Sequence, residues 1–167
     1  MSKKSVENPF TNESVTPVEQ EVMVVSRNDL ATTDLIEDLK NPDSAFFCSI
    51  KDDGTRASKI AIYNAVNSQD EQLSDHIGEV LEIVDVVAYP VTLTDPETGE
   101  ITNALRTVLV DVNGVKYGAV SAGITSSLQK IFAIVGMPSW TDEPVKMKIK
   151  QVKTNNGVNK VNTIELV

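Results

Sequence analysis

The residues best suited to chemistry are three lysines that alternate with apolar residues in the stretch VKMKIKQV, near the end of the sequence. Successive side chains of an extended strand point to opposite faces. Lys146, Lys148 and Lys150 would therefore share one face at intervals of about 7 Å, given a rise of about 3.3 Å per residue. Ammonium groups at this spacing can follow a phosphate backbone, and Lys153 and Lys160 add charge at the next hairpin. Lysines on an edge strand also prevent aggregation, so both interpretations stay open.

Aromatic and further basic side chains could complete a surface for single-stranded nucleic acid. Such surfaces combine basic grooves with aromatic platforms, because every base has a face that can stack. Taken singly, each candidate is more readily explained by packing in the core or at its rim. The candidates in predicted strands and polar loops are Lys59, Tyr63, Tyr89, Arg106, Lys116, Tyr117 and Trp140.

The sequence contains little that points to catalysis. It has no G-x-x-x-x-G-K-[ST], G-x-G-x-x-G or G-x-S-x-G motif. His76, the only histidine, lies in a polar stretch, and Cys48, the only cysteine, lies in an apolar one. We expect a surface histidine and a buried, inert thiol, and neither a disulfide nor a usual zinc site. The function is therefore predicted to need no catalytic residue, metal or cofactor.

Charge is distributed unevenly along a chain whose net charge is −9. Residues 1–100 hold 7 basic and 20 acidic side chains, whereas residues 101–167 hold 8 and 4. Local potential, rather than net charge, steers a charged ligand. The C-terminal part could therefore still bind a polyanionic partner. No apolar run approaches the ~20 residues of a membrane span. With no secretory signal at the start and a single cysteine, we expect a cytoplasmic protein that contacts no membrane.

Residues 1–20 show neither a helical nor a strand period, which predicts a flexible arm. Val6, Phe10, Val15 and Val18 are unexplained if this arm is only solvated. An arm that docks on a neighbouring subunit, and so makes an oligomer, is the second interpretation.

The segment 21–76 is predicted to be an α/β elaboration. Asp52-Asp53-Gly54 reads as a hairpin turn, and the stretch 68–76 as a helical turn. The expected strands and helix of this segment are 21–25, 32–39 (helix), 45–51 and 58–67.

The region 77–167 is more regular. Its helix carries apolar residues at i, i+3, i+4 and i+7, is capped by Thr125 or Ser126 and ends at Gly136. Asn113-Gly114 is a strong hairpin signal, and Pro90 marks an edge, a bend or a bulge. The expected elements are strands 78–94, 104–112 and 115–121, the helix 125–135, and strands 145–153 and 158–167.

This order, β-β-β-α-β-β, is that of an OB-fold, a five-stranded and partly open barrel, although other small barrels and α+β sheets share it. We predict a mainly β protein with one domain over 21–167. Its barrel core spans 77–167, and the helix plugs one end.

Three stretches together resemble small single-stranded DNA-binding proteins that phages and conjugative elements of Gram-positive bacteria encode. They are RTVLVDVNGVKYGAVSAG (106–123), SLQKIFAIVG (127–136) and the strand 145–153, within a similarity over roughly residues 45–167. The resemblance implies an OB-fold that coats single-stranded DNA, with little sequence preference, during replication or transfer of the element. It assigns DNA contact to Arg106, Lys116, Tyr117, Ser121, Lys146, Lys148 and Lys150.

Two features separate the chain from cellular single-strand binders: it lacks a glycine-rich linker with an acidic tip, and its acidic residues lie toward the N-terminus. An alternative function is therefore a structural or protein-interaction module of a phage or mobile element that binds no nucleic acid. The net charge of −9 and the few aromatic residues favour it, and a fold alone does not decide function.

Overall fold

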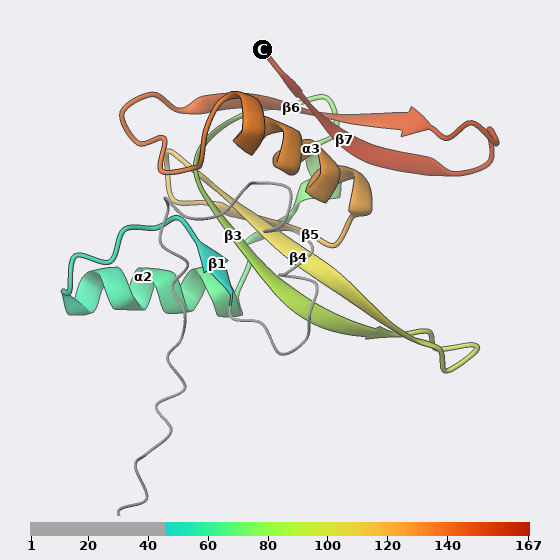
Figure 1. Ribbon diagram of the computed structural model, residues 1–167, viewed down its shortest axis with the longest axis horizontal. Coiled ribbons are helices and arrows are strands. Elements are labelled where there is room, and N and C mark those ends of the chain that lie inside the picture. The colour runs from blue at the N-terminus through green and yellow to red at the C-terminus, as the bar shows by residue number, and fades with distance from the viewer. Residues whose placement is uncertain (1–45) are drawn as a thin grey trace, which may run out of the picture.

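The computed structural model describes residues 46–167 (Figure 1). The expected arm over 1–20, strand over 21–25 and helix over 32–39 lie outside the described residues. In chain order the elements are β1 (Phe47–Cys48), α2 (Arg56–Asn67), β2 (Glu71–Gln72), the 3-10 helix η1 (Leu73–His76), β3 (Val80–Thr94), β4 (Ile101–Asp111), β5 (Lys116–Ala119), α3 (Ala122–Ile134), β6 (Val145–Lys153) and β7 (Lys160–Leu166).

One sheet, in the order β2-β5-β4-β3-β6-β7, forms a curled half-barrel, and β1 pairs with β3 away from this path. The mainly β prediction is confirmed, and from β3 onward the elements follow the predicted order. The sheet has seven strands instead of five because β1 and β2, from the N-terminal elaboration, join it. β5 pairs with β2 and β4, while β7 pairs with β6.

The 15-residue strand β3 is the centre of the sheet. One edge pairs with β4 along most of its length, and the other pairs first with β6 and then with β1. A register shift between Ile83 and Asp85 leaves Val84 as an extra residue, and such bulges bend a strand and increase its twist. Pro90 lies farther along, where β3 has only β4 beside it among the described residues, as an edge position predicts.

The hairpin predicted around Asp52-Asp53-Gly54 is wrong, because α2 occupies residues 56–67. Asp52 accepts a hydrogen bond from the N–H of Gly54 at 2.8 Å, and Asp53 accepts one from Thr55 at 2.9 Å. Thr55 in turn caps the helix, since its Oγ1 accepts from the N–H of Ser58. Side-chain capping, rather than strand pairing, therefore directs the chain after the turn.

The face of α2 toward the sheet is narrow. Ala65 is its one buried residue, and it packs with Val87 of β3 and Val108 of β4. Ile62 and Val66 flank Ala65 at helical spacing and are half-buried. Because so few of its residues are buried, the helical period of this segment is weak and is hard to distinguish from the alternation of a strand.

The second helix, α3, begins at Ala122, three residues before the predicted start. Ser121 is its N-cap, and its Oγ accepts from the N–H of Ile124 at 3.4 Å. Gly136 follows the helix with φ 108°, a left-handed conformation that glycine adopts readily, which confirms the predicted end. The buried face of α3 consists of Ile124, Thr125, Leu128, Ile131 and Phe132.

These side chains meet the inner face of the sheet in one core that includes Ile83, Leu109, Met147 and Ile149. The half-barrel thus closes over α3, as Figure 1 shows. Among the described residues, no helix is long and apolar enough to cross a membrane.

The contact between α3 and β7 depends on small side chains. A Cβ on Gly123 would overlap the carbonyl oxygen of Asn162 and a methyl group of Val161. Ser127 Oγ donates to the carbonyl of Gly123 at 2.8 Å and accepts from the N–H of Ile164 at 3.2 Å. The helix therefore supplies a hydrogen-bond acceptor for a backbone N–H at the outer edge of β7.

Gly123→Ala is expected to destabilise the protein by about 1–2 kcal/mol in urea denaturation. Alanine forms helices better than glycine by about 1 kcal/mol, but overpacking against backbone that cannot move aside costs typically about 1–3 kcal/mol. The exposed Ser126→Ala, in the same helix, is the control and should change stability by less than about 0.5 kcal/mol. A Gly123→Ala protein as stable as the parent would contradict the tight contact.

Candidate nucleic-acid interface

The three lysines of β6 share one face of the strand, as predicted. Met147 and Ile149, which alternate with them, are fully buried in the core. Lys146 and Lys150 are exposed and Lys148 is half-buried. The row therefore lies on the outer face of the half-barrel, on the side away from α3.

Two carboxylates from the flanking strands reach this row. Lys146 Nζ lies 3.4 Å from Glu82 Oε1 of β3, and Lys150 Nζ lies 2.6 Å from Glu165 Oε1 of β7. Lys148 stands between them and forms no ion pair with any of the described residues. Exposed ion pairs contribute only about 0–1 kcal/mol, so a phosphate could displace a carboxylate. Lys148 has Glu165 as its register partner, but the carboxylate of Glu165 pairs with Lys150.

Arg106, Lys116 and Tyr89 do not border the lysine row. Arg106 lies on β4 and Lys116 on β5, and neither strand is next to β6, because β3 lies between β6 and β4, and β5 is farther still. Arg106 is the register partner of Tyr89, and Lys116 that of Val110. The sequence order of the strands did not reveal which of them become neighbours.

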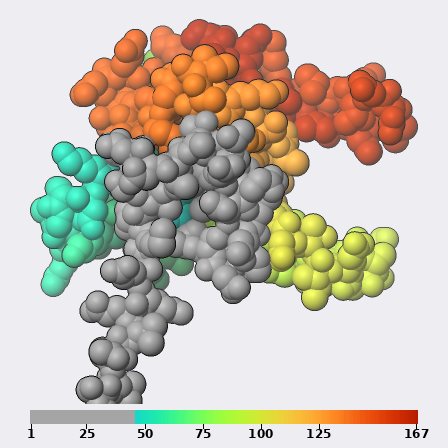
Figure 2. Space-filling view, in the orientation of Figure 1, coloured from blue at the N-terminus to red at the C-terminus, as the bar shows by residue number. Residues whose placement is uncertain are grey.

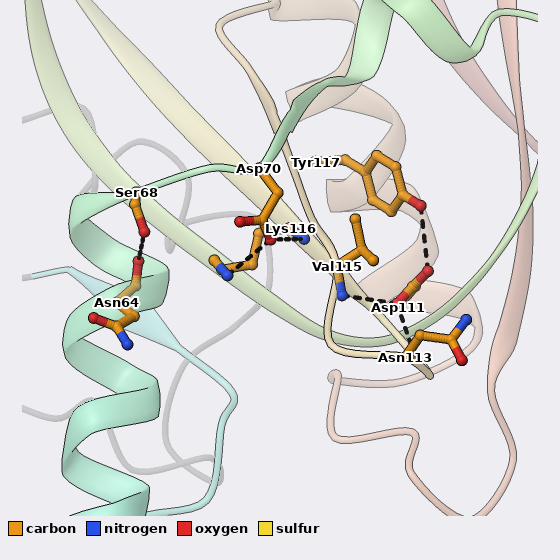
Figure 3. Close-up of polar contacts among 8 residues, drawn as sticks. All are labelled: Asn64, Ser68, Asp70, Asp111, Asn113, Val115, Lys116 and Tyr117. Atoms are coloured by element: carbon orange, nitrogen blue, oxygen red, sulfur yellow. Dashed lines mark hydrogen bonds and ion pairs between the residues drawn. The ribbon is translucent and has the colours of Figure 1, made fainter.

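Arg106 and Lys116 form a second basic group, which Gln69 and Asp70, just after α2, cover. Figure 3 shows the contact between Asp70 and Lys116. Asp70 Oδ2 accepts from the Nζ of Lys116 at 2.8 Å and from its backbone N–H at 2.9 Å, and these bonds lower the pKa of Asp70. Gln69 lies over Gly118, where a Cβ would overlap it, and accepts a long bond of 3.4 Å from Arg106. Both cations are thus engaged within the protein.

Tyr117 belongs to the core, which corrects its expected role as a stacking platform. It follows Lys116 in β5, so its side chain points to the opposite face, and it is 7% exposed. Its hydroxyl donates to Asp111 at 3.2 Å (Figure 3). Its ring meets that of His76 edge-on, with the ring centroids 4.9 Å apart. Burial is the main cause that raises the pKa of Tyr117 to about 12. No face of this ring is open to a base.

His76 is half-buried rather than a surface residue as expected. Its Nδ1 lies 2.7 Å from Glu79 and its Nε2 contacts Glu71, and the bond to Glu79 is the main cause that raises its pKa. Cys48 is half-buried rather than buried as expected, and desolvation raises the pKa of its thiol to about 11, which disfavours the nucleophilic thiolate.

The remaining candidates are scattered. Ser121 caps α3, and Trp140 packs against Phe132, with ring centroids 6.2 Å apart. Lys59 and Tyr63 lie on α2, not on a strand, and Tyr63 is 66% exposed. The structure therefore brings together the lysine row and a separate, covered basic group, but no single surface that holds all the predicted residues.

A family model described as phage single-stranded DNA-binding protein, of the phi29 type, matches residues 41–166. The chain belongs to this family. It therefore binds single-stranded DNA, and the resemblance noted from the sequence is confirmed. No curated protein and no solved structure matches the chain significantly, so the family model carries the identification.

This phage single-stranded DNA-binding protein has two projecting hairpins that the sequence did not reveal. The β3–β4 arm, beyond Ala88, and the β6–β7 arm, beyond Lys148, extend from the same side of the molecule with a notch between them (Figure 2). The start of α3 lies at their base (Figure 1). Such a notch arises only when the hairpins are longer than the strands that flank them.

Near the tip of the β6–β7 arm, Lys153 and Lys160 are direct register partners, and both are exposed. Like charges directly opposite each other destabilise a sheet, and neither lysine forms an ion pair within the described part of the chain. The next polar pair on this face is Gln151 and Asn162, joined by a bond of 3.3 Å. By alternation these pairs continue the inner face of Ile149, so an anion in the notch would meet them.

Lys148→Ala is expected to weaken binding to oligo-dT and to make the slope of log affinity against log salt about 0.7 shallower. The reason is that its Nζ, unlike those of Lys146 and Lys150, forms no ion pair with the described residues. Lys146→Ala and Lys150→Ala are matched controls on the same face and should change the slope less. Fluorescence anisotropy at several salt concentrations measures all three. Slopes equal to that of the parent would show that the lysine row does not contact the phosphates.

Proposed function

We propose that this protein coats single-stranded DNA without catalysing a reaction, and that it does so during replication or transfer of a phage or mobile element in the cytoplasm of the bacterial host. We also propose that its half-barrel is an OB-fold within one domain over residues 21–167. The strand order β5-β4-β3-β6-β7, with α3 between the third and fourth of these strands along the chain, supports this assignment.

The proposed DNA path runs through the notch between the two arms and around the tip of the β6–β7 arm onto the lysine row. OB-folds bind oligonucleotides with the loops of two such hairpins. The inner face of the β6–β7 arm presents Lys153, Lys160, Gln151 and Asn162, and no carboxylate. The main support for this path is the pair Lys153 and Lys160, which face each other across the hairpin and form no ion pair with the described residues.

Acidic residues limit the path on the other side of the notch. Asp95, Glu97 and Glu100 lie in the turn of the β3–β4 arm, where Asp95 accepts from the N–H groups of Glu97 and Thr98. These carboxylates would repel a phosphate at the tip of this arm. The DNA strand is therefore expected to pass away from the tip of this arm, close to α3.

Contacts of this kind explain a lack of sequence preference. Lysines that meet phosphates release counterions and carry no information about bases. The alternative of a scaffold that binds no nucleic acid loses its support with the family match, and the net charge of −9 does not oppose binding when basic residues gather locally.

The double variant Lys153→Ala with Lys160→Ala tests the path. We expect weaker binding to oligo-dT and to mixed-sequence oligonucleotides alike, with a salt slope about 1.4 shallower, because two phosphate contacts are lost at about 0.7 each. Anisotropy titrations over a range of salt concentrations measure both effects.

Lys51→Ala with Arg56→Ala is the matched control, because it removes two positive charges beside and at the start of α2, away from the arms. It should leave the salt slope nearly unchanged. If the two double variants lose the same affinity and slope, the binding responds only to net charge and the notch is not the path.

We further propose that residues 1–20 form an arm that mediates self-association. Removing them is expected to leave the affinity for a short oligonucleotide nearly intact and to reduce cooperative binding on long single strands, because Val6, Phe10, Val15 and Val18 would no longer dock on a neighbour. Light scattering with and without DNA measures the assembly. Unchanged scattering after truncation would mean that the arm has no role in association.

A further inference from the structure

A hollow of about 500 Å³ lies along the β3–β4 arm, from Leu93 near the tip of the arm to the start of α3. Leu93, Ala104 and Leu105 line it from the arm, and Val120 and Ala122 line it from the chain that leads into α3. Its volume falls within the range of about 300–1,000 Å³ that is typical of small-molecule sites. It is therefore large enough for a base with its sugar.

The hollow exists because β5 is short. β5 ends at Ala119, opposite Thr107 of β4, whereas β4 extends back to Ile101. Over residues 101–106, β4 has no described strand on this side. The edge of β4 is thus open where the chain turns away into α3.

The backbone of this open edge can form hydrogen bonds. Pro90 is the register partner of Leu105, and proline has no N–H to donate. The pair must therefore be a non-hydrogen-bonded one, in which the N–H and C=O of Leu105 point away from β3. By alternation those of Asn103 do the same, so both residues present a donor and an acceptor toward the hollow.

The chemistry of the lining selects the ligand. None of the residues that line the hollow is charged, and none is aromatic. A phosphate would find no cation there, whereas a base has apolar faces and an edge that needs hydrogen bonds. The hollow also borders the start of α3, toward which the acidic turn of the β3–β4 arm would direct the DNA.

We propose that this hollow takes one base of the bound DNA, held between apolar side chains of the β3–β4 arm and the start of α3, with the open edge of β4 as its hydrogen-bonding partner. The proposal rests on the proposed function and adds to it a base contact that uses no aromatic ring. This accounts for single-strand binding by a protein in which Tyr117 is buried, Tyr89 and Trp140 are half-buried, and the exposed Tyr63 lies on α2 rather than on an arm.

Ala122→Leu tests the proposal, because Ala122 is exposed and lines the hollow. Ala133→Leu is the matched control, since it makes the same change at another exposed position of α3 outside the hollow. Each protein is titrated with oligo-dT and with an abasic oligonucleotide of the same length. Thermal unfolding verifies that both variants remain folded, and Ser126→Leu, also at the hollow, provides a second test.

We expect Ala122→Leu to bind oligo-dT roughly five- to tenfold more weakly, the effect of losing the contacts of one base, and to bind the abasic strand like the parent. Ala133→Leu should change neither. Equal losses on both ligands, no loss on either, or a change in self-association alone would overturn the proposal, and the last result would indicate that a protein segment occupies the hollow. A parent protein that binds neither oligonucleotide would instead refute the proposed function.

Discussion

Burial of one face of the sheet against α3 is the constraint on which the other features depend. Met147 and Ile149 of β6 are fully buried, as are Ile83 of β3 and Leu128 of α3. Shifting β6 by one residue would move these apolar side chains to the solvent and its lysines into the core. The register that forms the core therefore also places Lys146, Lys148 and Lys150 outside, and the fold and the basic face have one cause.

The arms follow from the limited reach of α3. The helix is 13 residues long and covers only the base of the half-barrel, while β3–β4 and β6–β7 extend beyond it. Toward the tip of the β6–β7 arm the inner positions become polar, at the pairs Gln151–Asn162 and Lys153–Lys160. The inner face of the sheet is thus buried in the core near α3 and lines an open notch toward the tips of the arms.

The acidic composition coexists with DNA binding because carboxylates either pair with lysines or lie outside the β6–β7 arm. Asp52 and Asp95 accept backbone hydrogen bonds in turns, and Asp53 accepts from the hydroxyl and N–H of Thr55; these bonds lower their pKa values, so all three stay ionised there. Asp70 and Glu165 each pair with a lysine. A nucleic acid interacts most strongly with lysines that have no ion pair. Within the described chain these include Lys148, Lys153 and Lys160.

The sequence by itself determined the features that depend on neighbours within one or two turns. The alternation of β6, the apolar face of α3, the left-handed Gly136 and the turn at Asn113-Gly114 were all predictable, because strand and helix periods are local. The family was recognisable for the same reason, since its motifs are short stretches around these elements.

Only the tertiary structure decided what lies across from each residue. Alternation separates Lys116 from Tyr117 but does not say which of the two faces is the core. It cannot show that Glu82 and Glu165 neutralise two lysines of β6, or that Lys153 and Lys160 face each other. The helix α2 was missed because one buried residue, Ala65, leaves too weak a pattern. These features depend on contacts between segments far apart in the chain, which a local period does not record.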